Sequence, residues 1–137
     1  MPATIGAVQL PTPADHGLPD DATIVVPVPA PALTLYRLLE HERPREGDFE
    51  PSLSRNQAKV RGVPELFRGS VSFWLEEGLA VSASRRPTSF VARLVLTDTG
   101  LVHVASTEQR AKGHVDVWAH PEELLQAVVE VVRRRLH

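Results

Sequence analysis

The 137-residue chain contains no cysteine, which excludes disulfide bonds and thiolate metal sites and suits a reducing compartment. It has no apolar run near the roughly 18 residues that a membrane span requires. The first residues lack the basic start and apolar core of a signal peptide. An excess of charge of one sign is also missing, because the net charge is only −2. We therefore expect a cytoplasmic protein with neither a nucleic-acid partner nor a membrane partner.

The sequence also lacks the strong chemical motifs. It has no glycine-rich phosphate loop, Walker signature, nucleophile elbow or zinc-finger spacing. A function has to be inferred from smaller groups of residues.

Prolines are concentrated at the start of the chain, where eight of the 12 fall within residues 1–44. Proline fixes φ and removes an amide donor, so this region is predicted to form neither a helix nor a central strand. Residues 24–33, IVVPVPAPAL, are typical of an extended segment that covers a surface or edges a sheet. The chain length fits one domain. We predict a proline-rich extended N-terminal segment over residues 1–32 and a single α+β domain over residues 33–137.

Apolar runs predict the strands of this domain. They cover residues 34–40, 70–74, 89–96, 101–106 and 114–118. The sequence TDTG at 97–100 favours a hairpin turn that returns into 101–106. Residues 41–66 are predicted to form a long loop with one helical turn.

Two helices are predicted, a short one over residues 75–84 and a longer one that begins at Pro121. Arginines at 133–135 suit the carboxyl end of the second helix. Its apolar stripe is predicted to comprise Leu124, Leu125, Val128, Val131 and Val132. The expected fold is α+β, with a largely antiparallel twisted sheet, a short middle helix and a C-terminal helix.

The sequence HVDVWAH at 114–120 combines histidine with a carboxylate. Strand alternation places His114 and Asp116 on one face, and His103 is expected beside Asp116. This set could bind a divalent metal or shuttle protons, as in a metal-dependent hydrolase. A solvated face with His–Asp pairs is the favoured interpretation, because no third or fourth ligand is evident. We predict no metal site, and we expect His120 to cap the final helix.

Two arginines interrupt apolar strands. Arg37 and Arg93 each need an anionic partner if they are buried. That partner could be a bound phosphate, which matches the planar guanidinium, or an internal carboxylate. An internal ion pair, or a strand edge that reaches solvent, is the favoured interpretation.

Hydroxyl and aromatic side chains meet at residues 70–74. Ser70 and Ser72 share one face of the strand and could orient a ribose, while Trp74 could stack on a planar ring. The alternative is that Ser72 caps the following helix and that Phe73 and Trp74 belong to the core.

The run LYR, the later GSVSFW, a short helix and FVARLVL together resemble the start of the ADP-ribosyltransferase superfamily, over about residues 34–96. The resemblance implies that NAD binds and that ADP-ribose is transferred. Arg37 would hold the phosphates, and Ser70 or Ser72 would position the nicotinamide ribose. The superfamily also uses a late glutamate to stabilise the oxocarbenium-like ribose. Here that role would fall to Glu108 or to Asp116, because neither late strand contains a glutamate.

Two hypotheses for function follow. The first is a nucleotide-binding domain, an NAD-dependent ADP-ribosyltransferase or NAD glycohydrolase relative. It requires Arg37 and Ser72 to converge in one cleft with room for a pyrophosphate. The second is a non-catalytic interaction module, of the adaptor or immunity type, that dimerises or holds a protein partner through its N-terminal segment and its final helix.

Overall fold

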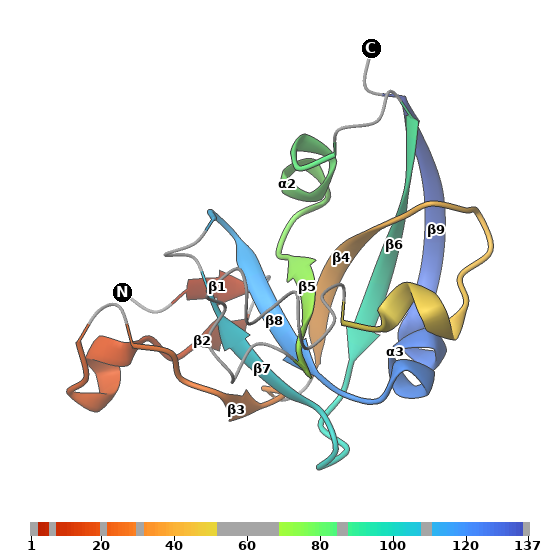
Figure 1. The fold of residues 1–137 in the computed structure, drawn as a ribbon. Helices are drawn as coiled ribbons and strands as arrows, with labels where there is room; N and C mark the ends of the chain where they lie inside the picture. The colour runs from red at the N-terminus through yellow and green to blue at the C-terminus, as the bar shows by residue number, and fades with distance from the viewer. Residues whose placement is uncertain are drawn as a thin grey trace, which may run out of the picture.

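The structure is a computed structural model that describes residues 3–5, 8–19, 22–29, 32–51, 69–84, 88–107 and 111–135. Its main feature is a seven-stranded sheet in the order β3-β7-β8-β5-β4-β6-β9, in which every pairing is antiparallel (Figure 1). In that order the strands are Val26–Pro27, His103–Ser106, His114–Trp118, Val71–Trp74, Leu33–Leu39, Thr88–Leu96 and Val128–Arg135.

The other elements are short. A separate hairpin joins β1 (Ala3–Ile5) to β2 (Val8–Leu10). The described part of the chain has two α-helices, α2 (Glu77–Ser82) and α3 (Pro121–Ala127), and two 3-10 turns, η1 (Pro13–His16) and η2 (Glu46–Phe49). The prediction of an α+β fold with a largely antiparallel sheet is confirmed. No helix in the described ranges is long and apolar enough to cross a membrane.

The hydrophobic core lies on one face of the sheet. Period-two alternation turns Leu35 of β4, Phe73 of β5 and Val115 of β8 to this face, and all three are fully buried. Helix α3 and η2 pack together over it and contribute Leu124 and Phe49 (Figure 1). We call this the core face, and the other side of the sheet the outer face.

The predicted final helix is only half right. Helix α3 ends at Ala127, and residues 128–135 continue as β9, which pairs with β6. β-Branched valines lose side-chain freedom in a helix and suit a pleated strand. The spacing of Val128, Val131 and Val132 fits a helical stripe. These residues form a strand instead, because one edge of β6 is free of β4 and β9 pairs with it.

The predicted hairpin at residues 97–100 is wrong as a pairing. Gly100 has a positive φ, as a turn requires, yet β6 pairs with β4 and β9, while β7 pairs with β3 and β8. Both edges of β6 are therefore occupied, and the chain crosses to another part of the sheet after the turn.

The N-terminal segment edges the sheet, as its prolines predict. Strand β3 is the outermost strand beside β7, and Val28 is buried to 2% exposure. The 3-10 turn η1 begins with Pro13 at its first position, where a missing amide does no harm. The helical turn predicted in the long loop is η2, and residues 52–68 of that loop lie outside the described residues.

Candidate functional site

Arg37 and Ser72, two of the residues proposed to bind NAD, lie on opposite faces of the sheet. Tyr36 of β4 is opposite Trp74 of β5, so both side chains are on the outer face, as is that of Ser72. Arg37, one residue along, points to the core face. The predicted cleft with a guanidinium and a hydroxyl on either side of a pyrophosphate is therefore not formed.

Arg37 instead joins three segments of its own chain. Its Nε donates to the main-chain carbonyl of Asp48 at 2.9 Å, and its Nη1 donates to the carbonyl of Ser72 at 2.7 Å. The guanidinium carbon lies 5.7 Å from the centre of the Phe73 ring, within the range of a cation–π contact. Burial lowers the pKa of Arg37 to about 10, and the Asp48 carboxylate opposes that shift. Arg37 therefore stays charged at neutral pH and ties η2 and β5 to β4.

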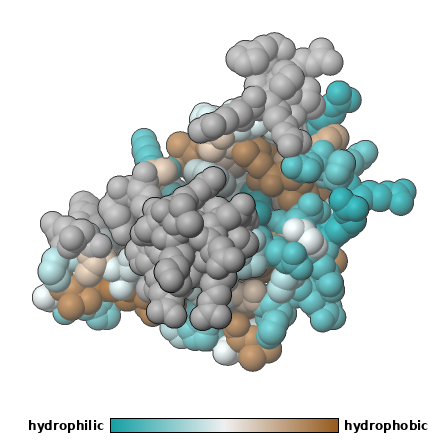
Figure 2. All heavy atoms as spheres, viewed as in Figure 1, coloured by the Kyte–Doolittle hydropathy of each residue, from teal (hydrophilic) through white to brown (hydrophobic). Residues whose placement is uncertain are grey.

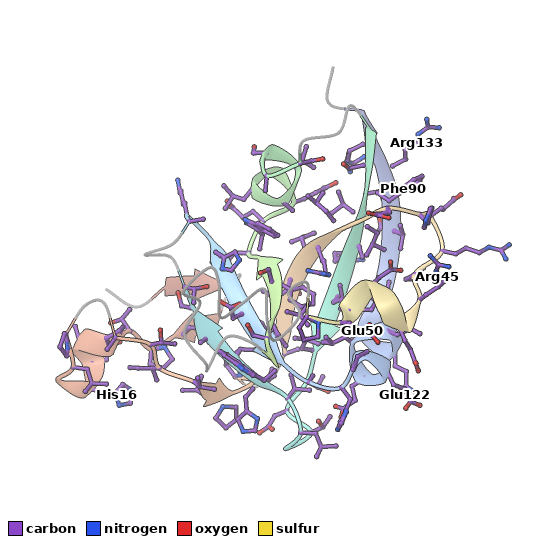
Figure 3. All side chains as sticks on the ribbon, viewed as in Figure 1. His16, Arg45, Glu50, Phe90, Glu122 and Arg133 are labelled. Atoms are coloured by element: carbon purple, nitrogen blue, oxygen red, sulfur yellow. The ribbon has the colours of Figure 1, made fainter. Side chains whose placement is uncertain are left out.

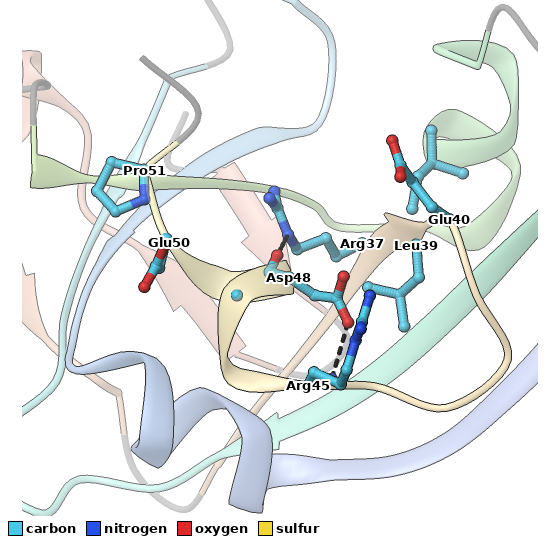
Figure 4. A pocket seen from close by; sticks show the side chains of 9 residues that line it. Arg37, Leu39, Glu40, Arg45, Asp48, Glu50 and Pro51 are labelled. Carbon is cyan, nitrogen blue, oxygen red and sulfur yellow. Dashed lines mark hydrogen bonds between the residues drawn. The ribbon is translucent and has the colours of Figure 1, made fainter. Parts of the chain in front are cut away.

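The structure has a cavity of about 640 Å³ beside Arg37 (Figure 4), a volume large enough for a ligand. The lining contains two guanidinium groups, from Arg37 and Arg45, and three carboxylates, from Glu40, Asp48 and Glu50. The Asp48 carboxylate accepts a hydrogen bond from the Arg45 amide at 2.8 Å, which closes the η2 turn. Because carboxylates outnumber guanidinium groups, this lining disfavours a pyrophosphate.

Ser70 and Asp116 form a buried pair on the outer face. The Ser70 hydroxyl donates to Asp116 Oδ1 at 2.9 Å, and the two residues are 8% and 2% exposed. His114 Nδ1 lies 3.7 Å from Asp116 Oδ2 and 2.6 Å from the Thr107 hydroxyl. The Trp74 ring meets the His114 ring edge-on. The predicted His–Asp pair is present, but the expectation of a solvated face is wrong here, because His114 is 8% and Asp116 is 2% exposed.

The structure places no third metal ligand beside His114 and Asp116 among the described residues. Within the described ranges, no group of three or more histidine and carboxylate side chains is placed to hold a metal ion. His103 shares the outer face with Asp116, but it is opposite Trp118, and Ala105 is opposite Asp116. The predicted position of His103 directly beside Asp116 is therefore wrong by two residues along the ladder.

The remaining predictions are resolved in part. Arg93 pairs with Glu130 at 3.2 Å, as the internal ion-pair interpretation expects. His120 is the residue before α3, but its side chain makes no capping hydrogen bond. Ser72 does not cap α2 either, because that helix begins after Glu76. Glu108, proposed as a catalytic residue, lies outside the described residues.

A feature that the sequence analysis missed is the outer edge of β9. Across the described ranges, no strand pairs with β9 on the side away from β6. The opposite edge of the sheet is only two residues long and includes Pro27, whereas β9 has eight residues and neither proline nor glycine. Short proline-containing strands discourage edge pairing, and long ones without proline permit it. The four valines of residues 128–132 were the available signal.

The exposed side chains along the β9 edge are mainly charged rather than hydrophobic. Glu130, Arg133 and Arg134 are exposed, and Arg133 points away from the body at the upper end of the strand (Figure 3). Figure 2 shows mainly hydrophilic residues on the side of the view where β9 and η2 lie. Val129 is the exception, at 54% exposure. The edge offers backbone hydrogen-bonding groups with an excess of positive charge.

A comparison of the chain with models of protein families, with curated proteins and with solved structures gives no match.

Proposed function

We propose that this domain is a non-catalytic protein-interaction module that binds an extended strand along the outer edge of β9, within the cytoplasm. Strand addition takes its affinity from main-chain hydrogen bonds and its selectivity from neighbouring side chains. The observation that carries the proposal is the asymmetry between the two sheet edges. One is two residues long with a proline, and the other is eight residues long with none.

The elements first predicted to bind a partner are engaged within the chain. Strand β3 of the N-terminal segment pairs with β7, and Leu124 of α3 is buried in the core. In the part of the chain that the structure describes, the outer edge of β9 stays available for a partner. Its exposed Arg133 and Arg134 favour an incoming strand that carries carboxylates.

The NAD-dependent function is not carried forward as the leading proposal. Arg37 donates to two carbonyls of its own chain, and its side chain is on the face opposite to that of Ser72. A dinucleotide at Arg37 would have to displace contacts that hold η2 and β5 in place.

Two labelled peptides test the interaction module. We expect the alternating acidic peptide (Glu-Val)4 to bind and raise fluorescence anisotropy, and the basic peptide (Lys-Val)4 not to bind. The substitution Arg133→Glu should reduce binding of the acidic peptide. The matched control is Lys112→Glu, because Lys112 is an exposed cation in the turn before β8 and the net charge changes equally.

Hydrogen exchange locates the binding. Peptide should slow exchange at amides of β9 and leave those of β3 unchanged. Light scattering on the same samples reports self-association, which would occupy the same edge. A chain that stays monomeric and captures neither peptide up to about 1 mM, the weak end of measurable affinity, rules the proposal out.

A further inference from the structure

We infer that the strand bound at the β9 edge is β9 of a second copy, paired antiparallel about a two-fold axis at Val132. This inference rests on the proposed function and names its partner. A symmetric dimer is the commonest assembly of soluble chains, and it uses the same surface on both subunits.

Symmetry restricts how two β9 strands can pair. Pairs along an antiparallel ladder alternate between hydrogen-bonded and non-hydrogen-bonded. A two-fold axis maps each pair onto a pair of the same kind, so the axis must pass through a residue that faces its own copy. The candidate centres are Glu130, Val131, Val132 and Arg133, because a centre nearer either end of β9 leaves few facing pairs within the strand.

Charge then selects one of the four. A centre at Glu130 places carboxylate against carboxylate, and a centre at Arg133 places guanidinium against guanidinium, which destabilises the pairing. A centre at Val131 sets Glu130 against valine. A centre at Val132 places Glu130 of each copy opposite Arg134 of the other copy, so two ion pairs form. It also keeps the arginines of the two copies at opposite ends of the ladder.

The ion pairs already present within each chain support this register. Arg134 pairs with Glu77 of α2, and Glu130 pairs with Arg93 of β6. Glu130 and Arg134 share the outer face with Arg93, because Glu130 is opposite Arg93 and four residues is an even number along a strand. In the dimer these groups form a row of alternating sign: Glu77 and Arg134 of one copy, then Glu130 and Arg93 of the second copy. The row occurs twice, and every neighbouring pair in it is attractive.

The shape of β9 fits the same centre. The register against β6 shifts between Arg93 and Leu94, so that Val129 is an extra, bulged residue. From Glu130 to Arg135 the register against β6 is regular, so the proposed centre at Val132 lies inside the regular stretch. With that centre, Val129 of each copy is opposite residue 135 of the other copy, so both bulges lie outside the central ladder of residues 130–134.

A cysteine scan tests the register directly, because the chain has no cysteine of its own. At the proposed axis the two Cα atoms of residue 132 would be about 4.5–5.5 Å apart, within the range of a disulfide. We expect Val132→Cys to form a disulfide-linked dimer under mild oxidation. The control is Val129→Cys, whose two copies would lie six residues apart along the ladder, about 20 Å, and should not cross-link.

A charge exchange tests the ion pairs. Glu130→Arg alone and Arg134→Glu alone should each be monomeric in sedimentation, because each sets like charges across the interface. An equimolar mixture should dimerise, since residues 130 and 134 then face opposite charges in both places. Circular dichroism checks that each variant is folded, and the cysteine scan keeps the inference testable if one is not.

The outcomes separate the two proposals. A wild-type chain that is monomeric at all concentrations, or a Val129→Cys variant that cross-links as well as Val132→Cys, overturns the dimer. If (Glu-Val)4 still binds to β9 in that case, the interaction module stands without the dimer. If neither the peptide nor a second copy binds, both proposals fall.

Discussion

The Arg37 side chain contacts Ser72 only at its main chain, where Nη1 donates a hydrogen bond to the Ser72 carbonyl. The Ser72 side chain lies on the other face of the sheet. Residues that a sequence motif groups as a ligand site can therefore be joined for a structural reason. The guanidinium satisfies carbonyls in a partly buried position where water would otherwise be needed.

Replacing this arginine should destabilise the fold. Arg37→Met keeps the length of the side chain but leaves the carbonyls of Asp48 and Ser72 without their donor. The free energy of unfolding should fall by about 3 kcal/mol, since each hydrogen bond from a charged group contributes about 1.5–3 kcal/mol. Urea denaturation measures this loss. The control Arg93→Met breaks a pair with Glu130 in which the Arg93 side chain is 40% exposed, and it should cost less than about 1 kcal/mol.

NAD should not stabilise the protein. In a thermal-shift titration we expect the same melting temperature with and without NAD, for wild type and for Arg37→Met alike. A ligand that binds only the native state raises the melting temperature. A rise with NAD that disappears in Arg37→Met would favour the NAD-dependent hypothesis over the structural role of Arg37.

Two serines on one strand face should respond differently to loss of the hydroxyl. Ser70→Ala removes the donor to buried Asp116 and should lower the free energy of unfolding by about 1–3 kcal/mol. Ser72→Ala should change it by less than about 0.5 kcal/mol, because the Ser72 side chain is only half-buried and its carbonyl, which Arg37 uses, is kept. Chemical denaturation of both variants gives the comparison. Equal losses would argue against the buried pair.

Gly113 should be hard to replace. Its φ is +71°, and an added Cβ would clash with the Leu79 side chain of α2. Gly113→Ala should cost about 1 kcal/mol for the backbone and about 1–3 kcal/mol more for crowding. Gly100→Ala is the matched control, with a φ of +78° and open space around it, and should show the backbone part alone.

A double-mutant cycle isolates the contact between Gly113 and Leu79. Adding Leu79→Ala to Gly113→Ala should recover the crowding part of the loss, which appears as a coupling energy between the two sites. Additive losses would show that Leu79 moves aside without a penalty.

The N-terminal segment should contribute to stability through its core residues. Val28 is 2% exposed and Val25 is 37% exposed. Val28→Ala should lower the free energy of unfolding by about 2 kcal/mol, because it leaves a cavity beside β3. Val25→Ala should have almost no effect. Similar small losses in both variants, measured by thermal unfolding, would mean that the segment is only loosely docked.

Much of the fold could be predicted from local patterns. Five strands, the middle helix and the start of α3 follow from apolar alternation and from Pro121 at a position that a helix tolerates. The prolines of residues 27–31 predicted an extended sheet edge. These features depend on the chemistry of a few neighbouring residues, which the sequence displays directly.

The arrangement of strands could not be predicted in that way. Residues 128–135 carry a spacing that suits both a helix and a strand, and the open edge of β6 decided for the strand. The partners of β7 were decided likewise, since β4 and β9 already occupied both sides of β6.

The amino-acid sequence by itself determined an α+β fold with an extended sheet edge that contains proline, because the apolar period and proline act locally. Only the tertiary structure decided which way Arg37 points, that Ser70 and Asp116 share a buried hydrogen bond, and which sheet edge stays open among the described strands. Each of these depends on strand register, and a shift of one residue reverses the face of every side chain.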